Sequence, residues 1–398
     1  MTDELRIRVV PAIADIPAAA WDACANPADL NSQDQAYNPF ISHAFLSALE
    51  TSDSATARSG WQPQHLVAET EGGAVLGVTP AYLKSHSRGE YVFDAGWAEA
   101  YERAGGSYYP KVQVSVPFTP ATGRRLLVPP SDAAVGVRQG LVSGLIELAK
   151  LRKASSVHVT FAPEREQHLL GEVGYLKRND QQFHWENANY ATFEDFLNAL
   201  AARKRKAIKR ERREALEHGI EVQWLTGSDL TESVWDTFFA FYMDTGSRKW
   251  GRPYLTRQFY SLIGQTMRDK IVLMMAKRAG RYIAGAINFI GSDTLYGRHW
   301  GAIEHHPFLH FEICYYQAIE FAIQNKLARV EAGAQGEHKL ARGYMPVTTY
   351  SAHYIADPAL RRAIADYLKR ERAYVEAAGA ELSAMGPFRK DLVFEQTS

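Results

Sequence analysis

The chain has 398 residues, which at roughly 150 residues per domain indicates two or three domains. Forty-five Lys and Arg residues balance forty-five Asp and Glu residues, and this formal net charge of zero excludes a wholly nucleic-acid-coating protein, which needs a large basic excess. With 46% hydrophobic and 23% charged residues, the composition is that of a folded globular protein. The only cysteines, Cys24 and Cys314, exclude a disulfide-rich secreted domain and fit a reducing compartment.

The N-terminal segment MTDELRIRVVPAIADIP carries charges where an export signal needs an apolar run of about 7 to 15 residues. No uncharged apolar run approaches the roughly 18 to 20 residues that span a bilayer. The sequence therefore predicts a cytoplasmic protein without a transmembrane segment, and leaves peripheral membrane contact open.

The chain contains an internal repeat of strands and helices. Alternating apolar residues around a glycine turn predict a hairpin over residues 65–83, turning at Gly72-Gly73, and a matching one over 272–290, turning at Ala279-Gly280. Each half continues with an amphipathic helix (133–152 and 308–326), a strand, a polar loop, a short helix closed by Gly-Tyr and a last strand. This order predicts an α/β fold with a mixed sheet flanked by helices, divided into domains 1–190 and 191–398.

A basic segment opens the second half. Thr192 and Asp195 resemble a capping box, and apolar residues spaced three and four apart predict one long helix from there to Gly219. Residues 203–214 hold eight basic and two acidic side chains, a net charge of +6, so the rest of the chain carries −6. A solvated helix face explains such a run, but the acids are too few to pair most of the bases. This favours an anionic partner: RNA, a nucleotide-linked substrate or anionic lipid headgroups. The anion-binding candidates are Arg203, Lys206, Lys209, Arg210 and Arg213.

Polar residues gather between positions 294 and 350. The first predicted strand of this stretch carries Arg298, His299 and Trp300, and the helix after it begins with His310 and Glu312. The next strand carries Glu331, and the loop that follows supplies Gln335, Glu337, His338, Lys339 and Arg342. Burying so many ionisable groups is costly, so we expect the active site here, in the second domain. The first domain has APEREQHLL at the matching loop and is expected to serve a structural or substrate-binding role.

Other chemistries have less support in the sequence. Pro307 interrupts helical presentation of His306 and His310, and no Cys lies near enough for a common zinc pattern, so no metal site is predicted. The sequence lacks a G-x-S-x-G elbow, a Walker A loop and a G-x-G-x-x-G fingerprint, which speaks against hydrolase, nucleotide triphosphatase and dinucleotide oxidoreductase activities.

Seven stretches of the chain form a recognisable set. The most specific are EAGAQGEHKLARGY and LHFEICYYQ, and the others are VPFTPATGRRLL, FHWEN, RKRKAIKRERR, TGSRKWGRPYLTRQFY and LYGRHWG. Together they resemble the FemAB-like predicted N-acyltransferases, of peptidoglycan biosynthesis/recognition type. The resemblance implies two tandem GNAT (acyl-CoA N-acyltransferase-like) domains and transfer of an acyl or aminoacyl group to an amine, in modification of a cell-envelope or peptidoglycan precursor. It implies no tightly bound cofactor.

The donor is left between aminoacyl-tRNA and acyl-CoA. An ordinary acetyl-CoA-using GNAT holds the pyrophosphate with an R/Q-x-x-G-x-G/A loop, whereas this chain has EHHPFLHFE at that place in its second half and PFTPATGRRL in its first. Together with the basic helix, this departure favours aminoacyl-tRNA.

For catalysis we expect Glu331 as the general base, with His310 as second choice. Arg298, His338, Lys339 and Arg342 would orient anionic groups, and His184 and Trp185 would line a cleft between the halves. The structural alternative is a buried Glu331–Arg342 ion pair, with Trp185 and Trp300 in the core. Two rival functions remain: an acyl-CoA-dependent N-acetyltransferase, or a non-catalytic binding protein for an envelope precursor or RNA.

Overall fold

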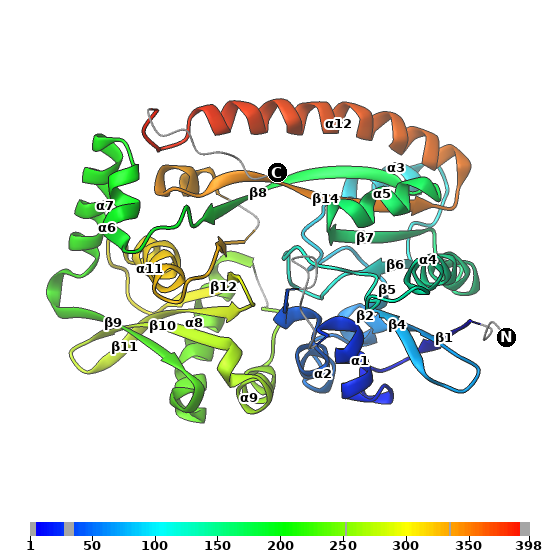
Figure 1. Ribbon diagram of the computed structural model, residues 1–398, viewed down its shortest axis with the longest axis horizontal. Coiled ribbons are helices and arrows are strands. Elements are labelled where there is room, and N and C mark those ends of the chain that lie inside the picture. The colour runs from blue at the N-terminus through cyan, green and yellow to red at the C-terminus, as the bar shows by residue number, and fades with distance from the viewer. Residues whose placement is uncertain (1–4, 28–35, 251–252, 334–335, 391–398) are drawn as a thin grey trace. The chain divides into compact units, whose positions relative to one another are not determined.

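The computed structural model describes residues 5–27, 36–250, 253–333 and 336–390 (Figure 1). Contacts divide the chain into two compact units. Unit 1 comprises Met1–Asp180, Tyr254–Phe259 and Thr348–Glu376, and unit 2 comprises Gln181–Pro253, Tyr260–Val347 and Ala377–Ser398. The division therefore differs from the predicted cut at residue 190, because both units are discontinuous in sequence.

Two long strands account for part of this discontinuity, and the segment Tyr254–Phe259 adds a further break. Strand β8 (Leu176–Glu186) begins in unit 1, but its last residues pair with β13 (Arg329–Glu331) of unit 2. Strand β14 (Met345–Ile355) begins in unit 2, and from Tyr350 on it pairs with β7 (Ser156–Ala162) of unit 1. Each unit thus obtains an edge of its sheet from a distant part of the chain.

Unit 1 holds a three-stranded sheet of order β1-β3-β4, from β1 (Arg6–Val10), β3 (His65–Glu69) and β4 (Val75–Thr79). Its part of the large sheet has the order β2-β5-β6-β7-β14, with β2 (Trp61–Pro63), β5 (Ala81–Lys84) and β6 (Lys111–Val114). The predicted hairpin over 65–83 is present, but Pro80 divides its second strand: β4 pairs with β3 while β5 pairs with β2 and β6. Proline offers no N–H to continue a ladder.

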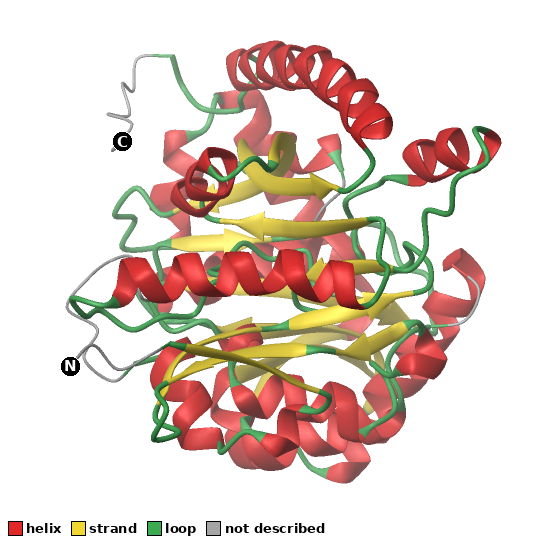
Figure 2. Cartoon of the chain, turned by 90° about the vertical axis from the view of Figure 1, so that its right-hand side faces the viewer, coloured by secondary structure: helices red, strands yellow, loops and turns green. Residues whose placement is uncertain are grey.

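The helices of unit 1 include α4 (Ala134–Leu151), which matches the predicted helix and buries Leu141, Leu145 and Leu148 against the strands. Figure 2 shows this long helix lying along the sheet. The others are α1 (Ala18–Ala25), α2 (His43–Thr51), α3 (Ala95–Arg103), α5 (Glu164–Glu172) and most of α12 (Pro358–Ala384). Short 3₁₀ turns span Ile13–Asp15, Pro39–Ile41 and Ala57–Ser59.

Unit 2 has the strand order β8-β13-β12-β11-β10-β9, with β9 (Ile220–Thr226), β10 (Ile271–Arg278), β11 (Arg281–Ile290) and β12 (Thr294–Ala302). Its β10–β11 hairpin turns at Ala279-Gly280 as predicted, with φ of +48° and +78°. The helices are α6 (Phe193–Ala199), α7 (Ala202–Ala215), α8 (Glu232–Trp250), α9 (Arg257–Thr266), α10 (Leu309–Phe311), the π-helix η8 (Glu312–Tyr316) and α11 (Gln317–Gln324). Short 3₁₀ turns are η5 (Glu217–Gly219), η6 (Gly227–Asp229), η7 (Arg268–Lys270) and η9 (Glu337–Arg342).

The prediction of one long helix after Thr192 is wrong. The capping box of Thr192 and Asp195 is confirmed, but α6 ends at Ala199, and Leu200 and Ala201 adopt extended backbone before α7 begins. Leu200 forms a β-bridge with Phe388, and the Ala201 N–H donates to the Pro387 carbonyl oxygen at 2.9 Å. These long-range backbone bonds take the place of the helical bonds that the local pattern predicted.

The repeat is confirmed by the order of elements. Helix α4, strand β7, helix α5 and strand β8 in the first half correspond to α10–α11, β13, η9 and β14 in the second. Both short helices end before a Gly-Tyr pair whose glycine has a positive φ, +97° at Gly174 and +92° at Gly343. No described helix combines the length and apolar composition needed to cross a membrane.

Candidate functional site

The site in unit 2 forms where β12 parts from its parallel neighbour. Strand β13 pairs with β12 only along Thr294–Tyr296, whereas β12 runs on to Ala302. A bulge between Ile287 and Asn288 of β11 interrupts its ladder with β12 at the same level. The second part of β12 therefore faces the α10–η8 helix without a parallel strand beside it.

A small cavity of about 100 Å³ lies at this opening. Strands β11 and β12 supply Ala286, Asn288, Gly297, Arg298, His299 and Trp300, the helix supplies His310, Cys314 and Tyr315, and Ala332 follows β13. The described lining thus combines cationic and neutral polar groups and includes no carboxylate.

A wider pocket of about 600 Å³ adjoins the small cavity. Its lining comes from α8 (Asp244, Thr245, Arg248), from β12 and the loop after it (Trp300, Ala302, Ile303, Glu304, His305, His306), and from the helix start (Phe308, Leu309, His310, Phe311). Trp300 and His310 line both spaces, and their rings meet edge to face at 5.2 Å between centroids. The two cavities therefore share one wall.

The helix behind this wall is irregular. It begins after Phe308, which has a φ of +59°, and η8 has π-helical bonding. Single π-helical turns inside helices occur often at functional sites. Glu312, predicted to bind substrate, is fully buried and accepts hydrogen bonds from Arg212 of α7 (2.9 Å) and from Gln317 (2.7 Å). Its carboxylate packs α7 onto the helix and lines neither cavity.

The loop after β13 and η9 support the same wall. His338 Nε2 lies 2.9 Å from the Tyr315 hydroxyl, and the Arg342 guanidinium lies 3.5 Å from the Phe311 ring centroid. Arg342 also forms an ion pair with Glu211 at 2.9 Å, so the predicted alternative partner Glu331 is replaced by a residue of α7.

Of the other residues predicted in this loop, Lys339 is placed by the structure. Lys339 is buried and donates to the Gly333 carbonyl oxygen at 2.8 Å, and burial lowers its pKa to about 8. Gln335 and the side chain of Glu337 lie outside the described residues.

Glu331 and His310, the two predicted catalytic residues, are not brought together. Glu331 is buried, 6% exposed, opposite Tyr296 and His184 in the sheet, and the His184 Nε2 lies 4.0 Å from its carboxylate. Neighbouring Val330 and Trp185 face the core that includes α11, so Glu331 points to the other face of the sheet. It lines neither cavity, whereas His310 lines both.

His184 and Trp185 are buried side chains of strand β8. Burial, followed by the positive charges of Arg329 and Lys339, lowers the pKa of His184 to about 3. Trp185 is fully buried among core residues, as the structural alternative predicted. Trp300 differs, because it is partly exposed and lines both cavities.

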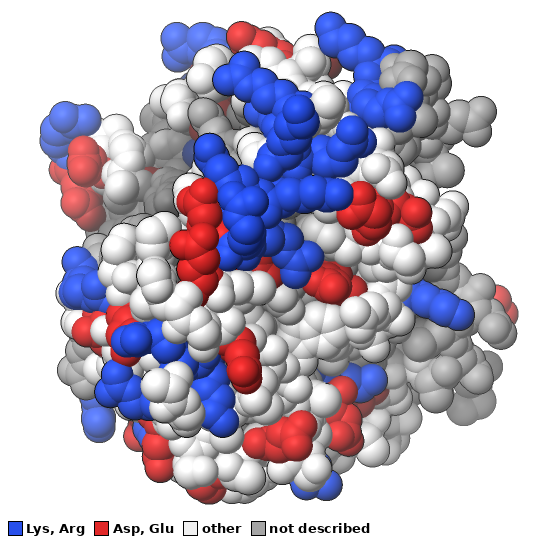
Figure 3. Space-filling view, turned by 90° about the vertical axis from the view of Figure 1, so that its left-hand side faces the viewer, with Lys and Arg blue, Asp and Glu red and all other residues white. Residues whose placement is uncertain are grey.

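Helix α7 carries two sets of basic residues. On one side, Arg212 reaches Glu312 and Glu320, while Lys209 and Arg210 form exposed pairs with Glu194 and Glu214. Arg203, Lys206 and Arg213 are exposed and form no ion pair with the described part of the chain. Figure 3 shows Lys and Arg side chains gathered on the side of the molecule where α7 lies.

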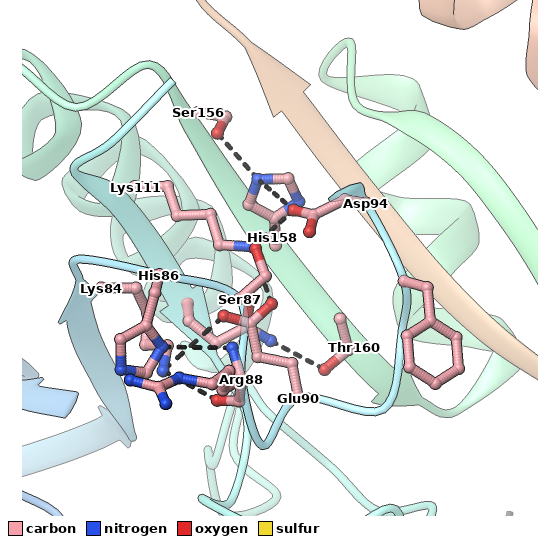
Figure 4. A network of polar contacts seen from close by, with 12 residues as sticks. Lys84, His86, Ser87, Arg88, Glu90, Asp94, Lys111, Ser156, His158 and Thr160 are labelled. Carbon is pink, nitrogen blue, oxygen red and sulfur yellow. Dashed lines mark hydrogen bonds and ion pairs between the residues drawn. The ribbon is translucent and has the colours of Figure 1, made fainter. Parts of the chain in front are cut away.

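Unit 1 contains a buried charge network that the sequence patterns did not reveal (Figure 4). Lys111 of β6 is fully buried, and its ammonium group donates to Glu90 (2.7 Å), Asp94 and Ser87. Asp94 also accepts the Tyr108 hydroxyl at 2.7 Å. The local signal of this arrangement is a single lysine in the short strand KVQV, all four residues of which are buried.

Two buried histidines extend the network. His158 Nε2 lies 2.7 Å from the Ser156 hydroxyl, and its Nδ1 lies 2.7 Å from Nδ1 of His353. Burial is the main cause that lowers the pKa of both histidines, to about 3 for His158. Among the described residues, no group of three or more His, Cys, Asp or Glu side chains is placed to hold a metal ion.

Sequence reasoning missed Asn288, Cys314 and Tyr315 at the small cavity, and Asp244 and Arg248 at the wide pocket. Asn288 had a visible signal, since it is the single polar side chain in the apolar run IAGAINFI. Arg248 lies in the stretch TGSRKWGRPYLTRQFY, whereas Asp244 had no signal, and the approach of both to β12 depends on tertiary packing.

Solved structures with the same fold include FemX, with 12% identity and a TM-score of 0.52 over 88% of this chain and 98% of that chain. The C-terminal domain of a putative lysylphosphatidylglycerol synthetase from Agrobacterium fabrum has 8% identity and a TM-score of 0.52, over 90% and 97% of the two chains. L-PGS from Bacillus licheniformis has 8% identity and a TM-score of 0.50, over 85% and 99%. At such identities the likeness shows the fold alone.

No curated protein sequence matches the chain. A family model described as peptidoglycan biosynthesis/recognition matches residues 12–390, and both this match and the repeated mixed-sheet units agree with the tandem GNAT fold that the resemblance implied. The chain belongs to the FemAB-like family.

Proposed function

We propose that the protein is an N-acyltransferase that moves an acyl or aminoacyl group to an amine of a cell-envelope precursor. The observation that carries this proposal is the pair of cavities that share Trp300 and His310 as a wall. Acyl transfer needs two reactants whose reacting atoms meet at one point, and two adjoining spaces of unequal size offer that arrangement.

The reaction balances without a redox partner. The nitrogen of the acceptor amine attacks the carbonyl carbon of the donor, a C–N bond forms, and the C–O bond of an ester or the C–S bond of a thioester breaks. The amine loses a proton, and the leaving oxygen or sulfur gains one. Cationic and N–H groups near the shared wall would stabilise the oxyanion that develops between these steps.

His310 is the residue we favour as general base. Its ring lines both cavities beside Trp300, whereas Glu331 faces the other side of the sheet. A base must come within hydrogen-bond reach of the proton that it accepts, directly or through one water molecule. Glu331 remains the rival candidate from the sequence.

Aminoacyl-tRNA is the donor we favour, because Arg203, Lys206 and Arg213 leave α7 with exposed positive charge that suits a polyanion. One structural neighbour is named a putative lysylphosphatidylglycerol synthetase, and this name fits aminoacyl transfer on the same fold. Acyl-CoA is the alternative donor, and the wide pocket would then hold its nucleotide end.

The test supplies labelled aminoacyl-tRNA and acyl-CoA in parallel, with an amine-bearing peptidoglycan-precursor peptide, and detects products by mass. We expect product from aminoacyl-tRNA, and His310→Gln should lower kcat by roughly 10²- to 10⁴-fold because a general base contributes about that much. The matched control is His168→Gln, an exposed histidine of α5 that lines neither cavity. Full turnover by His310→Gln together with loss in Glu331→Gln would reverse the assignment.

A non-catalytic binding protein is the second candidate, favoured by the exposed bases of α7 alone. RNA binding without acyl product from either donor would support it and exclude transferase activity.

A further inference from the structure

Asn288 gives the small cavity an unusual wall. It is 1% exposed and lies in the apolar strand β11, yet it lines the cavity. Its Nδ2 lies 3.5 Å from the carbonyl oxygens of Val272 and Ala286, and its Oδ1 has no hydrogen-bond partner among the described residues. A buried carboxamide oxygen without a partner is costly, and at a cavity wall it indicates a donor group on a bound ligand.

The orientation of the Asn288 carboxamide follows from its neighbours. If oxygen and nitrogen were exchanged, the oxygen would face two backbone carbonyl oxygens, which also only accept hydrogen bonds. The oxygen is therefore the carboxamide atom that is left without a described partner. A Cβ at Gly297 would lie 3.3 Å from this oxygen, a tight contact that the glycine avoids.

The charges around the cavity restrict the ligand. The titratable groups of the lining are Arg298 and His299 from β12 and His310, Cys314 and Tyr315 from the helix, all of them cationic or neutral when Cys314 and Tyr315 are protonated. Beyond the lining, η9 brings Lys339 and His338, and β13 carries the carboxylate of Glu331 on the other face of the sheet. Such a setting disfavours an ammonium ion and favours the neutral form of a bound amine.

We propose that the small cavity binds the acceptor as a neutral primary amine and that Asn288 Oδ1 accepts one of its N–H bonds. This inference rests on the proposed function and names the side from which the acceptor enters. The carbonyl group of an ester or thioester offers only hydrogen-bond acceptors, so the group that the amine attacks cannot satisfy Asn288, whereas the attacking amine can. With one N–H held there, the nitrogen lone pair is left to point toward the wall shared with the wide pocket.

Cys314 provides a reporter that needs no acyl donor. It lines the cavity, while the other cysteine, Cys24, is 1% exposed and burial raises its thiol pKa to about 11. The full chain is treated with iodoacetamide, and alkylation of Cys314 is followed by mass spectrometry with ethylamine or with acetonitrile, a probe of similar size that donates no hydrogen bond through N–H or O–H.

We expect ethylamine to slow Cys314 alkylation and acetonitrile to have little effect. The protection factor is the ratio of the Cys314 alkylation rate without ethylamine to the rate with it at the same pH. This factor should rise about tenfold per pH unit from pH 8 to 10, because an alkylamine with a pKa near ~10.4 gains neutral form over that range. In Asn288→Leu the ethylamine concentration for half protection should rise roughly tenfold.

Gln113→Met is the matched control, since Gln113 is a fully buried amide of unit 1 whose Oε1 also lacks a described partner. It should keep ethylamine protection. Equal protection by acetonitrile, protection independent of pH, or unchanged protection in Asn288→Leu would each overturn the inference. If alkylation is too slow to follow, a melting-temperature rise with ethylamine that is smaller in Asn288→Leu replaces it as the readout, and an equal rise overturns the inference.

The two proposals fail separately. Ethylamine protection without acyl product from either donor would contradict the transferase activity and leave an amine-binding cavity. Acyl transfer without Asn288-dependent protection would contradict this inference alone.

Discussion

Lys111 shows how one buried residue can hold a loop in place. Its ammonium group joins Glu90 and Asp94, which lie on the segment between β5 and α3, to strand β6. Burial acts to raise the pKa of the Asp94 carboxyl, but the attraction of Lys111 and His158 outweighs it and holds that pKa below its usual value. The carboxylates are stable in the interior only while their cation is present.

We predict that Lys111→Met lowers the free energy of unfolding by about 3–5 kcal/mol, because it leaves buried carboxylates without a counter-charge. Urea unfolding of the full chain measures the change. Lys150→Met is the control, since Lys150 pairs with Glu147 on the exposed face of α4 and such pairs contribute about 0–1 kcal/mol. Similar losses in both variants would contradict a special role for the network.

At the scale of the element, α7 divides its charges between structure and solvent. Arg212 forms an ion pair with the buried Glu312 of η8. Glu211 forms another with Arg342 of η9. This face of α7 therefore packs against η8 and η9. The exposed residues Arg203, Lys206 and Arg213 have no such task. The break at Leu200 sets where this basic helix begins.

We predict that alanine substitution of Arg203, Lys206 and Arg213 together weakens RNA binding and flattens its salt dependence. Losing three phosphate contacts should reduce the slope of log K against log salt by about 2 to 3, at roughly 0.7 to 0.9 per contact. Fluorescence anisotropy with a labelled tRNA at several salt concentrations measures the slope. The charge-matched control replaces Arg362, Lys369 and Arg370, which are exposed on α12; equal effects of the two triple variants would contradict a site on α7.

At the scale of the whole molecule, buried histidines couple stability to pH. His158 and His353 in unit 1 and His184 in unit 2 are all at most 3% exposed, and burial is the first cause of their lowered pKa values. An unfolded histidine titrates near ~6.5, so between that pH and about 3 the unfolded chain binds protons that the folded chain does not. The free energy of unfolding therefore falls as the pH drops below about 6.5.

We predict a loss of about 2 kcal/mol per histidine between pH 7 and pH 5, at about 1.4 kcal/mol per pH unit below ~6.5. Urea unfolding at a series of pH values measures it. His184→Gln should remove one histidine's share of the slope, whereas exchange of the exposed His305 for Gln should leave the slope unchanged. A free energy of unfolding that stays constant between pH 7 and pH 5 would rule out this linkage.

Features that depend on neighbours in the chain could be predicted from the sequence. The Ala279-Gly280 turn, the Thr192 cap, the bounds of α4 and the repeated Gly-Tyr closures follow from local backbone preferences and apolar periodicity. The segment with Trp300 and His310 was also identified, because ionisable and aromatic residues crowd it.

Contacts between groups that are distant in the chain could not be predicted, because they depend on tertiary packing. Hydrogen bonds between distant segments pair β8 with β13 and β14 with β7, and they also set the break at Leu200. A charge far away in the chain likewise pairs Arg342 with Glu211. The register of β13 likewise sets the side of the sheet on which Glu331 lies. Tertiary packing also places Asn288, whose Oδ1 lacks a partner among the described residues, in the lining of the small cavity. Periodicity reports which residues share a face, but the partner of that face is set by packing over the whole domain.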